Sequence, residues 1–169
     1  MLNALRRRKE YRLKAAKLHA ATVARAREPV FFAIFGVKDT LDGRFDLIVL
    51  HAWLVLDRLK GGPLSQAFVD RVFIGFDEAL RELGAGDIGM GTRVKKLADA
   101  FYGRMQAYSE ATDEASMKTA LVRNLYRGEP DTAANILARY VMYSRDRLAA
   151  SDLEEGQLDF GPLPEKVTG

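Results

Sequence analysis

Residues 45–60, FDLIVLHAWLVLDRLK, decide the fold of this chain. Wound as a helix, this stretch places leucine, isoleucine, valine and alanine on nearly every side. A helix of that kind must be covered by other elements in several directions, and the glycines that begin at Gly61 end it. We therefore expect the segment from Phe45 to Lys60 to be the central helix of a single globular all-α domain.

Helical spacing of apolar residues continues on both sides of this segment. The expected flanking helices span residues 3–27, 64–83, 92–108, 113–126 and 131–150. The aromatic run 30–35 would suit a strand, but no second strand signal is nearby to pair with it, so we expect a short buried helix. Residues 36–44 read as a loop with Asp42-Gly43 as a turn dipeptide. In total we expect about six or seven helices, packed around the central one.

The chain divides into three parts by composition. Residues 1–27 are a basic amphipathic helix, residues 28–150 are the helical body, and residues 151–169 are an acidic, irregular tail. A length of 169 residues suits one domain with a real core. No apolar segment of signal-peptide length follows the first basic residues, so secretion is not expected.

Composition also excludes several kinds of site. With 48% hydrophobic residues the chain is too apolar to be disordered. The chain has no cysteine, which rules out disulfides and thiolate metal sites, and its two histidines cannot make a multi-histidine centre. We expect neither a metal ion nor a cofactor.

Charge is unevenly distributed along the chain. The first 30 residues carry nine Lys/Arg and two Asp/Glu, a net +7, whereas the other 139 carry 17 and 21, a net −4. Such asymmetry suggests an anionic partner for the N-terminal end, either RNA, a lipid surface or an acidic protein. The candidate contact residues there are Arg6, Arg7, Arg8, Lys9, Lys14 and Lys17.

The same N-terminal helix carries a weak apolar stripe at helical spacing. Its members are Leu2, Leu5, Leu13, Ala16, Ala20 and Val23. The simplest interpretation is a terminal helix docked on the body, with its basic face in solvent. Contact of that face with RNA, lipid headgroups or a partner is the alternative.

A glycine-rich loop at residues 84–91 matches the pattern G-x-G-x-x-G. The dinucleotide-binding mechanism needs a strand before the loop, and here a helix precedes it, so a helix cap and tight turn are the better interpretation. The helix that follows begins with Arg93, Lys95 and Lys96. Because helix N-termini attract anions, this end could also hold a phosphate or an acidic side chain.

His51 is the one candidate for catalysis. It lies on the apolar central helix, where a lone histidine is usually a hydrogen-bonded core residue. A catalytic role would need a base or nucleophile within reach, and the sequence assembles no G-x-S-x-G, P-loop or H-E-x-x-H pattern. We expect a protein that is not an enzyme, with a small enzyme using His51 as a remote alternative.

The segment Phe101-Tyr102-Gly103-Arg104 points to close contact. Gly103 costs about 1 kcal/mol inside a helix relative to alanine, which suggests that another backbone or a partner comes close. Tyr102 and Arg104, with Tyr108 a further turn along, are residue types that anchor interfaces. A tight crossing of helices within the chain would explain the same pattern.

Several stretches together resemble the ubiquinol–cytochrome c chaperone family. They are DTLDGRFDL at 39–47, LH at 50–51, VF at 72–73, FD at 76–77, GDI at 86–88, VKKLA at 94–98, AFYGR at 100–104 and AY at 107–108. The resemblance covers roughly residues 28 to 145, and its order and spacing are specific. The short chain looks like the bacterial members rather than the longer mitochondrial ones.

The resemblance implies a helical, non-enzymatic assembly factor for the cytochrome bc1 complex. Such proteins hold newly made cytochrome b, in mitochondria together with a small partner and near the ribosome exit. The expected client of this chain is therefore cytochrome b or another bc1 subunit. The resemblance further implies a location in the bacterial cytoplasm or peripheral to the inner membrane, the matrix side in a eukaryote. DNA is not an expected partner. An RNA- or ribosome-binding adaptor acting through the basic N-terminal helix is the alternative function.

A chaperone of a membrane subunit needs an exposed apolar surface. The expected candidates are the aromatic cluster of Phe31, Phe32 and Phe35, although all three could equally belong to the core. The remaining candidates for client or partner binding are Asp42, Arg44, Tyr102, Arg104 and Tyr108.

Overall fold

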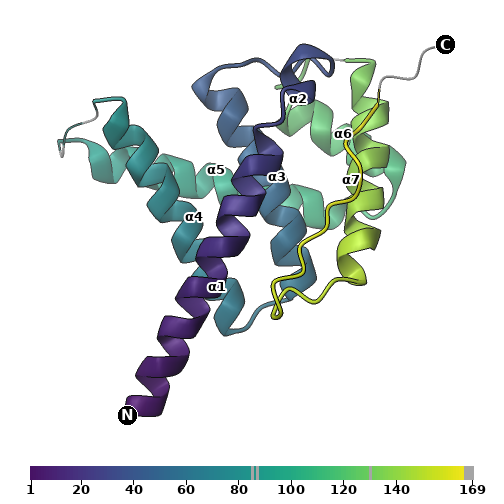
Figure 1. Cartoon of the computed structure of the whole chain (residues 1–169). Helices are drawn as coiled ribbons and strands as arrows, with labels where there is room; N and C mark the ends of the chain where they lie inside the picture. The colour runs from purple at the N-terminus through teal and green to yellow at the C-terminus, as the bar shows by residue number, and fades with distance from the viewer. Residues whose placement is uncertain (85, 87, 130, 166–169) are drawn as a thin grey trace.

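The computed structural model describes residues 1–84, 86, 88–129 and 131–165, and across these residues it is all-helical (Figure 1). The all-α expectation is therefore confirmed. The seven helices of the described residues are α1 (Leu2–Ala26), α2 (Val30–Ala33), α3 (Leu41–Leu59), α4 (Pro63–Glu82), α5 (Met90–Glu110), α6 (Glu114–Asn124) and α7 (Ala133–Ala149). The run at 30–35 forms the expected short helix, α2.

Helix α3 is the centre of the molecule, with contacts to α1, α4, α5 and α7. It begins at Leu41, four residues before the expected start, so the expectation of a loop through residue 44 is wrong. The Thr40 side chain caps the helix by accepting a hydrogen bond from the Gly43 amide at 3.1 Å. Gly43 permits this entry, because a Cβ there would lie 1.9 Å from the carbonyl oxygen of Lys38.

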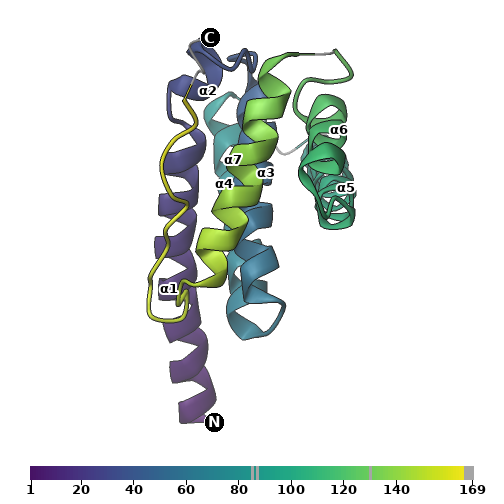
Figure 2. The ribbon, with the colours of Figure 1, turned by 90° about the vertical axis from the view of Figure 1, so that its right-hand side faces the viewer.

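The other helices surround α3 in two groups. Helix α1 runs along α3 and α4, while α6 and α7 pack against each other on the far side (Figures 1 and 2). Helix α4 and the first half of α5 project from the body as an arm (Figure 1). On this arm Val94, Leu97 and Ala98 of α5 are only half-buried.

Helix α1 docks with a different face from the one its sequence suggests. The buried residues are Ala15, Leu18, Thr22 and Ala26. The expected apolar stripe points to solvent instead: Leu2, Leu5 and Leu13 are 84%, 58% and 59% exposed. The docked face can pack closely because its alanines have small side chains. The buried Thr22 hydroxyl has a hydrogen-bond partner, because it donates to the Leu18 carbonyl at 2.7 Å.

The described part of the C-terminal segment, residues 151–165, contains no helix and is docked between α1 and α7 (Figure 2). Leu153 and Phe160 are buried. The Ser144 hydroxyl donates to the Phe160 carbonyl at 2.6 Å, and the Arg25 guanidinium donates to the Gly161 carbonyl. Within the described residues, no helix combines the length and apolar character that crossing a bilayer requires.

Candidate partner-binding surfaces

A buried ion cluster ties three parts of the fold together. Asp46 of α3 is fully buried and lies 2.9 Å from a guanidinium nitrogen of both Arg104, on α5, and Arg127, in the turn after α6. Burial raises the pKa of Asp46 to about 6, although both guanidiniums favour the ionised form. The Arg104 guanidinium also lies over the Phe45 ring, 5.7 Å from its centroid.

This cluster corrects the role expected of Arg104. The Arg104 side chain is 15% exposed and is committed to Asp46, so it cannot serve as an exposed interface anchor. The two most specific sequence stretches, at 39–47 and 100–104, therefore meet inside the protein. The ion pair between Asp46 and Arg104 joins α3 to α5.

Tyr108 is also a core residue rather than an accessible one. Its side chain is fully buried, and its ring centroid lies 5.7 Å from that of Trp53. The Trp53 indole N–H donates to the Ser109 hydroxyl at 3.0 Å. The expectation that Tyr108 contacts a client is wrong, because its position one turn past Arg104 points it at α3.

His51 is fully buried and hydrogen-bonded at both ring nitrogens. Its Nδ1 donates to the Leu47 carbonyl at 2.8 Å, which leaves Nε2 to accept from the Tyr140 hydroxyl at 2.9 Å. Burial lowers the pKa of His51 to about 4. With no exposed edge, the imidazole cannot reach a substrate, so the alternative of an enzyme using His51 loses its support.

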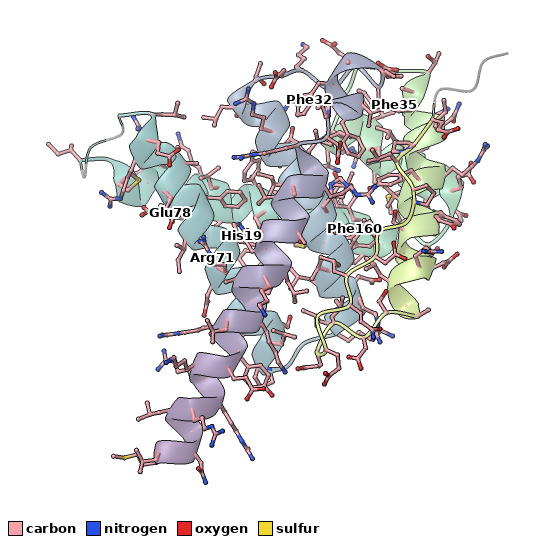
Figure 3. The ribbon with its side chains drawn as sticks, viewed as in Figure 1. His19, Phe32, Phe35, Arg71, Glu78 and Phe160 are labelled. Atoms are coloured by element: carbon pink, nitrogen blue, oxygen red, sulfur yellow. The ribbon has the colours of Figure 1, made fainter. Side chains whose placement is uncertain are left out.

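The aromatic cluster near α2 divides between core and surface. Phe31 and Phe35 are buried, at 0% and 1% exposure, and the Phe31 ring packs edge-on against His51. The expectation that these two form a client surface is therefore wrong, since they fill the end of the core. Phe32 remains half-exposed (Figure 3).

Phe32 contributes to a shallow depression of about 680 Å³. Its other lining residues are Arg27, Pro29, Ala33, Asp39 and Arg44. Arg44 donates to Asp39 at 2.7 Å, and this hydrogen bond lowers the pKa of the Asp39 carboxyl. Asp42 is exposed beside it, at the start of α3. Of the residues expected from the 39–47 stretch, Asp42 and Arg44 are thus accessible.

The arm carries the most accessible aromatic residue of the expected set. Tyr102 is 56% exposed, and its ring stacks on that of Phe73 from α4 at 6.2 Å. Gly103 beside it has open space where a Cβ would point, so the close approach expected there does not come from within the described residues. Further exposed apolar side chains on α4 and at the tip are Ile74, Leu83 and Ile88.

The described residues of the glycine-rich loop, 84, 86 and 88–91, lie at the tip of this arm (Figure 1). Residues 85 and 87 of the loop lie outside the described residues. Arg93, Lys95 and Lys96 are exposed on the first two turns of α5. The expectation that they hold an anion stays a prediction.

A groove of about 1240 Å³ lies between the first half of α1 and α4. Arg7, Arg8 and Arg12 contribute cations to its walls, with Tyr11 and Ile74 among the apolar residues. Arg6, Lys9 and Lys17 are exposed elsewhere on α1, whereas Lys14 is half-buried and pairs with Glu10 at 3.3 Å and Glu154 at 3.6 Å. Most of the expected cations are therefore available to a partner.

The sequence did not predict the contact by which α1 packs against α4. A Cβ at Gly75 would lie 2.9 Å from Nε2 of His19, so this glycine lets the two helices approach closely. Arg71 and Glu78 lie on the same side of α4 and pair at 3.7 Å (Figure 3). Partial burial, and Arg71 to a lesser extent, lower the pKa of His19. The sign of this contact in the sequence was a single glycine, Gly75, inside the helical pattern of apolar residues in α4.

The described residues thus form an all-α protein with exposed basic and apolar side chains and no accessible histidine on its central helix. The family model for ubiquinol-cytochrome C chaperones matches residues 33–155. This chain belongs to that family, as its 39–47 and 100–104 stretches predict.

Relatives and a solved structure agree with this assignment. The chain is 24% identical to ubiquinol-cytochrome-c reductase complex assembly factor 1 of Xenopus laevis, covering 92% of this chain and 84% of the relative. It is 27% identical to the mitochondrial protein CBP3 of Saccharomyces cerevisiae, over 81% of this chain and 46% of that protein. The crystal structure of the Cbp3 homolog from Brucella abortus matches with a TM-score of 0.79 and 35% identity, over 95% of this chain and 98% of the other.

The lengths of these relatives differ from that of this chain. It spans about half of the yeast protein and 56% of the human assembly factor 1, but nearly all of the Brucella chain. The match to the family model, over residues 33–155, begins after α1.

Proposed function

We propose that this protein is a non-enzymatic assembly chaperone of the cytochrome bc1 complex that holds newly made cytochrome b. The observation that carries the proposal is the family match over residues 33–155, in a chain whose relatives are named as assembly factors of this complex. The buried position of His51 supports a role without catalysis, because the one candidate general base has no access to a substrate.

The arm is the surface proposed to bind the client. A transmembrane subunit exposes apolar helices before it is assembled, and a helix of that kind is covered best by a groove or face of apolar side chains. The arm offers Tyr102 and Leu83, each more than half exposed, and the Tyr102 ring stacks on the half-buried Phe73. Gly103 adds an open stretch of α5 backbone beside Tyr102, against which a second helix could pack closely.

The depression around Phe32 is the surface proposed for a second protein. Its aromatic floor and the flanking Arg27 and Arg44 suit a small protein partner that supplies an apolar side chain and a carboxylate. The site of action that follows from this client is the cytoplasmic face of the inner membrane, or the matrix face in a mitochondrion.

Co-isolation of newly made cytochrome b with tagged protein tests the client surface. Wild-type protein should retain pulse-labelled cytochrome b, whereas Tyr102→Ala combined with Leu83→Asp should lose most of it, because hot-spot residues of an interface carry much of its affinity. Tyr143→Ala is the matched control, since Tyr143 is also exposed but lies on α7, away from the arm. Equal retention by all three proteins would refute the arm as the client surface.

A further inference from the structure

The outer face of α1 is amphipathic on its own, apart from the face that docks. Successive helical residues turn by about 100°, so Leu2, Leu5, Leu13, Ala16 and Ala20 fall within an arc of about 80°. The docked residues, from Ala15 to Ala26, lie on nearly the opposite side of the helix. All five residues of this outer stripe are exposed.

Cations border the outer stripe along its length. Arg6 and Lys17 lie at one edge and Arg12 at the other, and all three are exposed. Lys9 lies within the stripe, where its aliphatic stem can follow the apolar surface while the ammonium reaches outward. The only acid among residues 1–27 is Glu10, and it pairs with Lys14.

The stripe is also placed so that a flat surface can reach it. The first turns of α1 extend beyond the rest of the molecule (Figures 1 and 2). From Leu2 to Ala20 the stripe is about 27 Å long at 1.5 Å per residue. The C-terminal segment contacts α1 through Lys14 and Arg25, which lie away from the stripe, and so leaves it uncovered.

We propose that the outer face of α1 binds the chain to an anionic phospholipid surface, with Leu2, Leu5 and Leu13 inserted between headgroups and Arg6, Lys9, Arg12 and Lys17 paired with phosphates. Lipid is favoured over RNA because RNA would use the cations but would leave three exposed leucines in water. Leucines on one face and Lys/Arg at its borders are the combination that lies in a membrane interface. Charge complementarity selects acidic lipids over zwitterionic ones.

This inference goes beyond the proposed chaperone function, because it concerns a separate face and needs no client. Its consequence is positional. The chaperone would be bound at the membrane surface where a membrane subunit is inserted. The arm, on the other side of α1, would remain free to contact that subunit.

Vesicle sedimentation of the full chain tests the inference. The probes are vesicles of phosphatidylcholine alone and of phosphatidylcholine with one-third phosphatidylglycerol, at fixed ionic strength. Wild-type protein should bind the acidic vesicles at least about tenfold more tightly. Arg6→Gln, Lys9→Gln and Arg12→Gln together should weaken binding about 100-fold, while the equal charge change Arg93→Gln, Lys95→Gln and Lys96→Gln on α5 should weaken it far less.

The leucines separate insertion from simple charge attraction. Leu5→Asn with Leu13→Asn should weaken binding to acidic vesicles by more than about tenfold at unchanged charge. Leu83→Asn, an equally exposed leucine on the arm, is the control. Loss of wild-type selectivity for acidic lipid, or full binding by the leucine variant, would overturn the proposal. So would tighter binding to a structured RNA that competes with vesicles and ignores the leucine substitutions.

Discussion

Among single residues, Asp46 and Arg104 explain part of two specific sequence stretches, 39–47 and 100–104, because they pair in the interior of the protein. Asp46 belongs to the stretch 39–47 and Arg104 to the stretch 100–104. The two residues form an ion pair that joins α3 to α5. The sequence contains both residues within the stretches that resemble the family, but their pairing depends on how α5 crosses α3. Sequence reasoning therefore identified the motif correctly and misplaced Arg104 and Tyr108 at the surface.

Removing Asp46 should destabilise the fold strongly. Asp46→Ala leaves Arg104 as a cation with little access to water, so the free energy of unfolding should fall by about 3–5 kcal/mol in a urea titration. Asp42→Ala is the control, because Asp42 is exposed one turn earlier and should cost less than about 1 kcal/mol. Equal losses in the two variants would contradict the role given to the cluster.

The buried His51 should make stability depend on pH. Its pKa is about 4 in the fold and 6.5 when unfolded, so the unfolded chain takes up a proton first as the pH falls. Its contribution is intact above pH 6.5 and is lost towards pH 4. Between pH 7.5 and pH 5 this should cost about 2 kcal/mol of unfolding free energy.

A His51→Gln variant isolates this effect. His19 also has a lowered pKa and shifts stability in the same direction, whereas Asp46, with a pKa raised to about 6, shifts it in the opposite direction, so the wild-type protein reports all three groups. In chemical unfolding at the two pH values, the difference in unfolding free energy between the wild-type protein and the variant should change by about 2 kcal/mol, which is the contribution of His51 alone. An unchanged pH dependence in the variant would mean that His51 is not the responsible group.

At the scale of helices, the sequence predicted which segments are helical better than which face each helix buries. Six helices and the short α2 were expected close to where they lie, because apolar spacing and glycine stops are local signals. The buried face of α1 could not be found that way. Its docked residues are mainly small, Ala15, Thr22 and Ala26, and the larger leucines of the other face dominate the periodicity.

Two helical glycines should respond in opposite directions to alanine. Gly43→Ala places a Cβ 1.9 Å from the Lys38 carbonyl oxygen and should destabilise the protein by about 3 kcal/mol. Gly103→Ala points into open space and should stabilise it by about 0.5–1 kcal/mol. Thermal unfolding of both variants checks this, and a destabilised Gly103→Ala would reveal a contact that the structure lacks.

At the scale of the whole molecule, the C-terminal segment closes the core. Composition predicted an irregular acidic tail, and it could not show that two apolar residues within that tail would dock. Phe160 packs against His51 and lies under the Arg25 guanidinium, so the segment joins α1 to α7. The described part of the tail, residues 151–165, thus belongs to the folded unit although it contains no helix.

Phe160→Ala should therefore cost about 3–5 kcal/mol of unfolding free energy, the usual loss when a buried phenylalanine is truncated. Gln157→Ala, at an exposed position in the same segment, should change stability by less than about 0.5 kcal/mol. Urea titration of the two variants measures the difference. A tail that merely rests on the surface would give two small and similar values.

The central claim is that this chain assists assembly of the cytochrome bc1 complex. The most direct measurement is the amount of assembled complex, read from cytochrome b absorbance and ubiquinol oxidation, in cells from which the gene has been deleted. Deletion should cause a large loss of both, and the wild-type gene and the Tyr143→Ala variant should each restore them. Normal cytochrome b and normal ubiquinol oxidation in the deletion strain would contradict it.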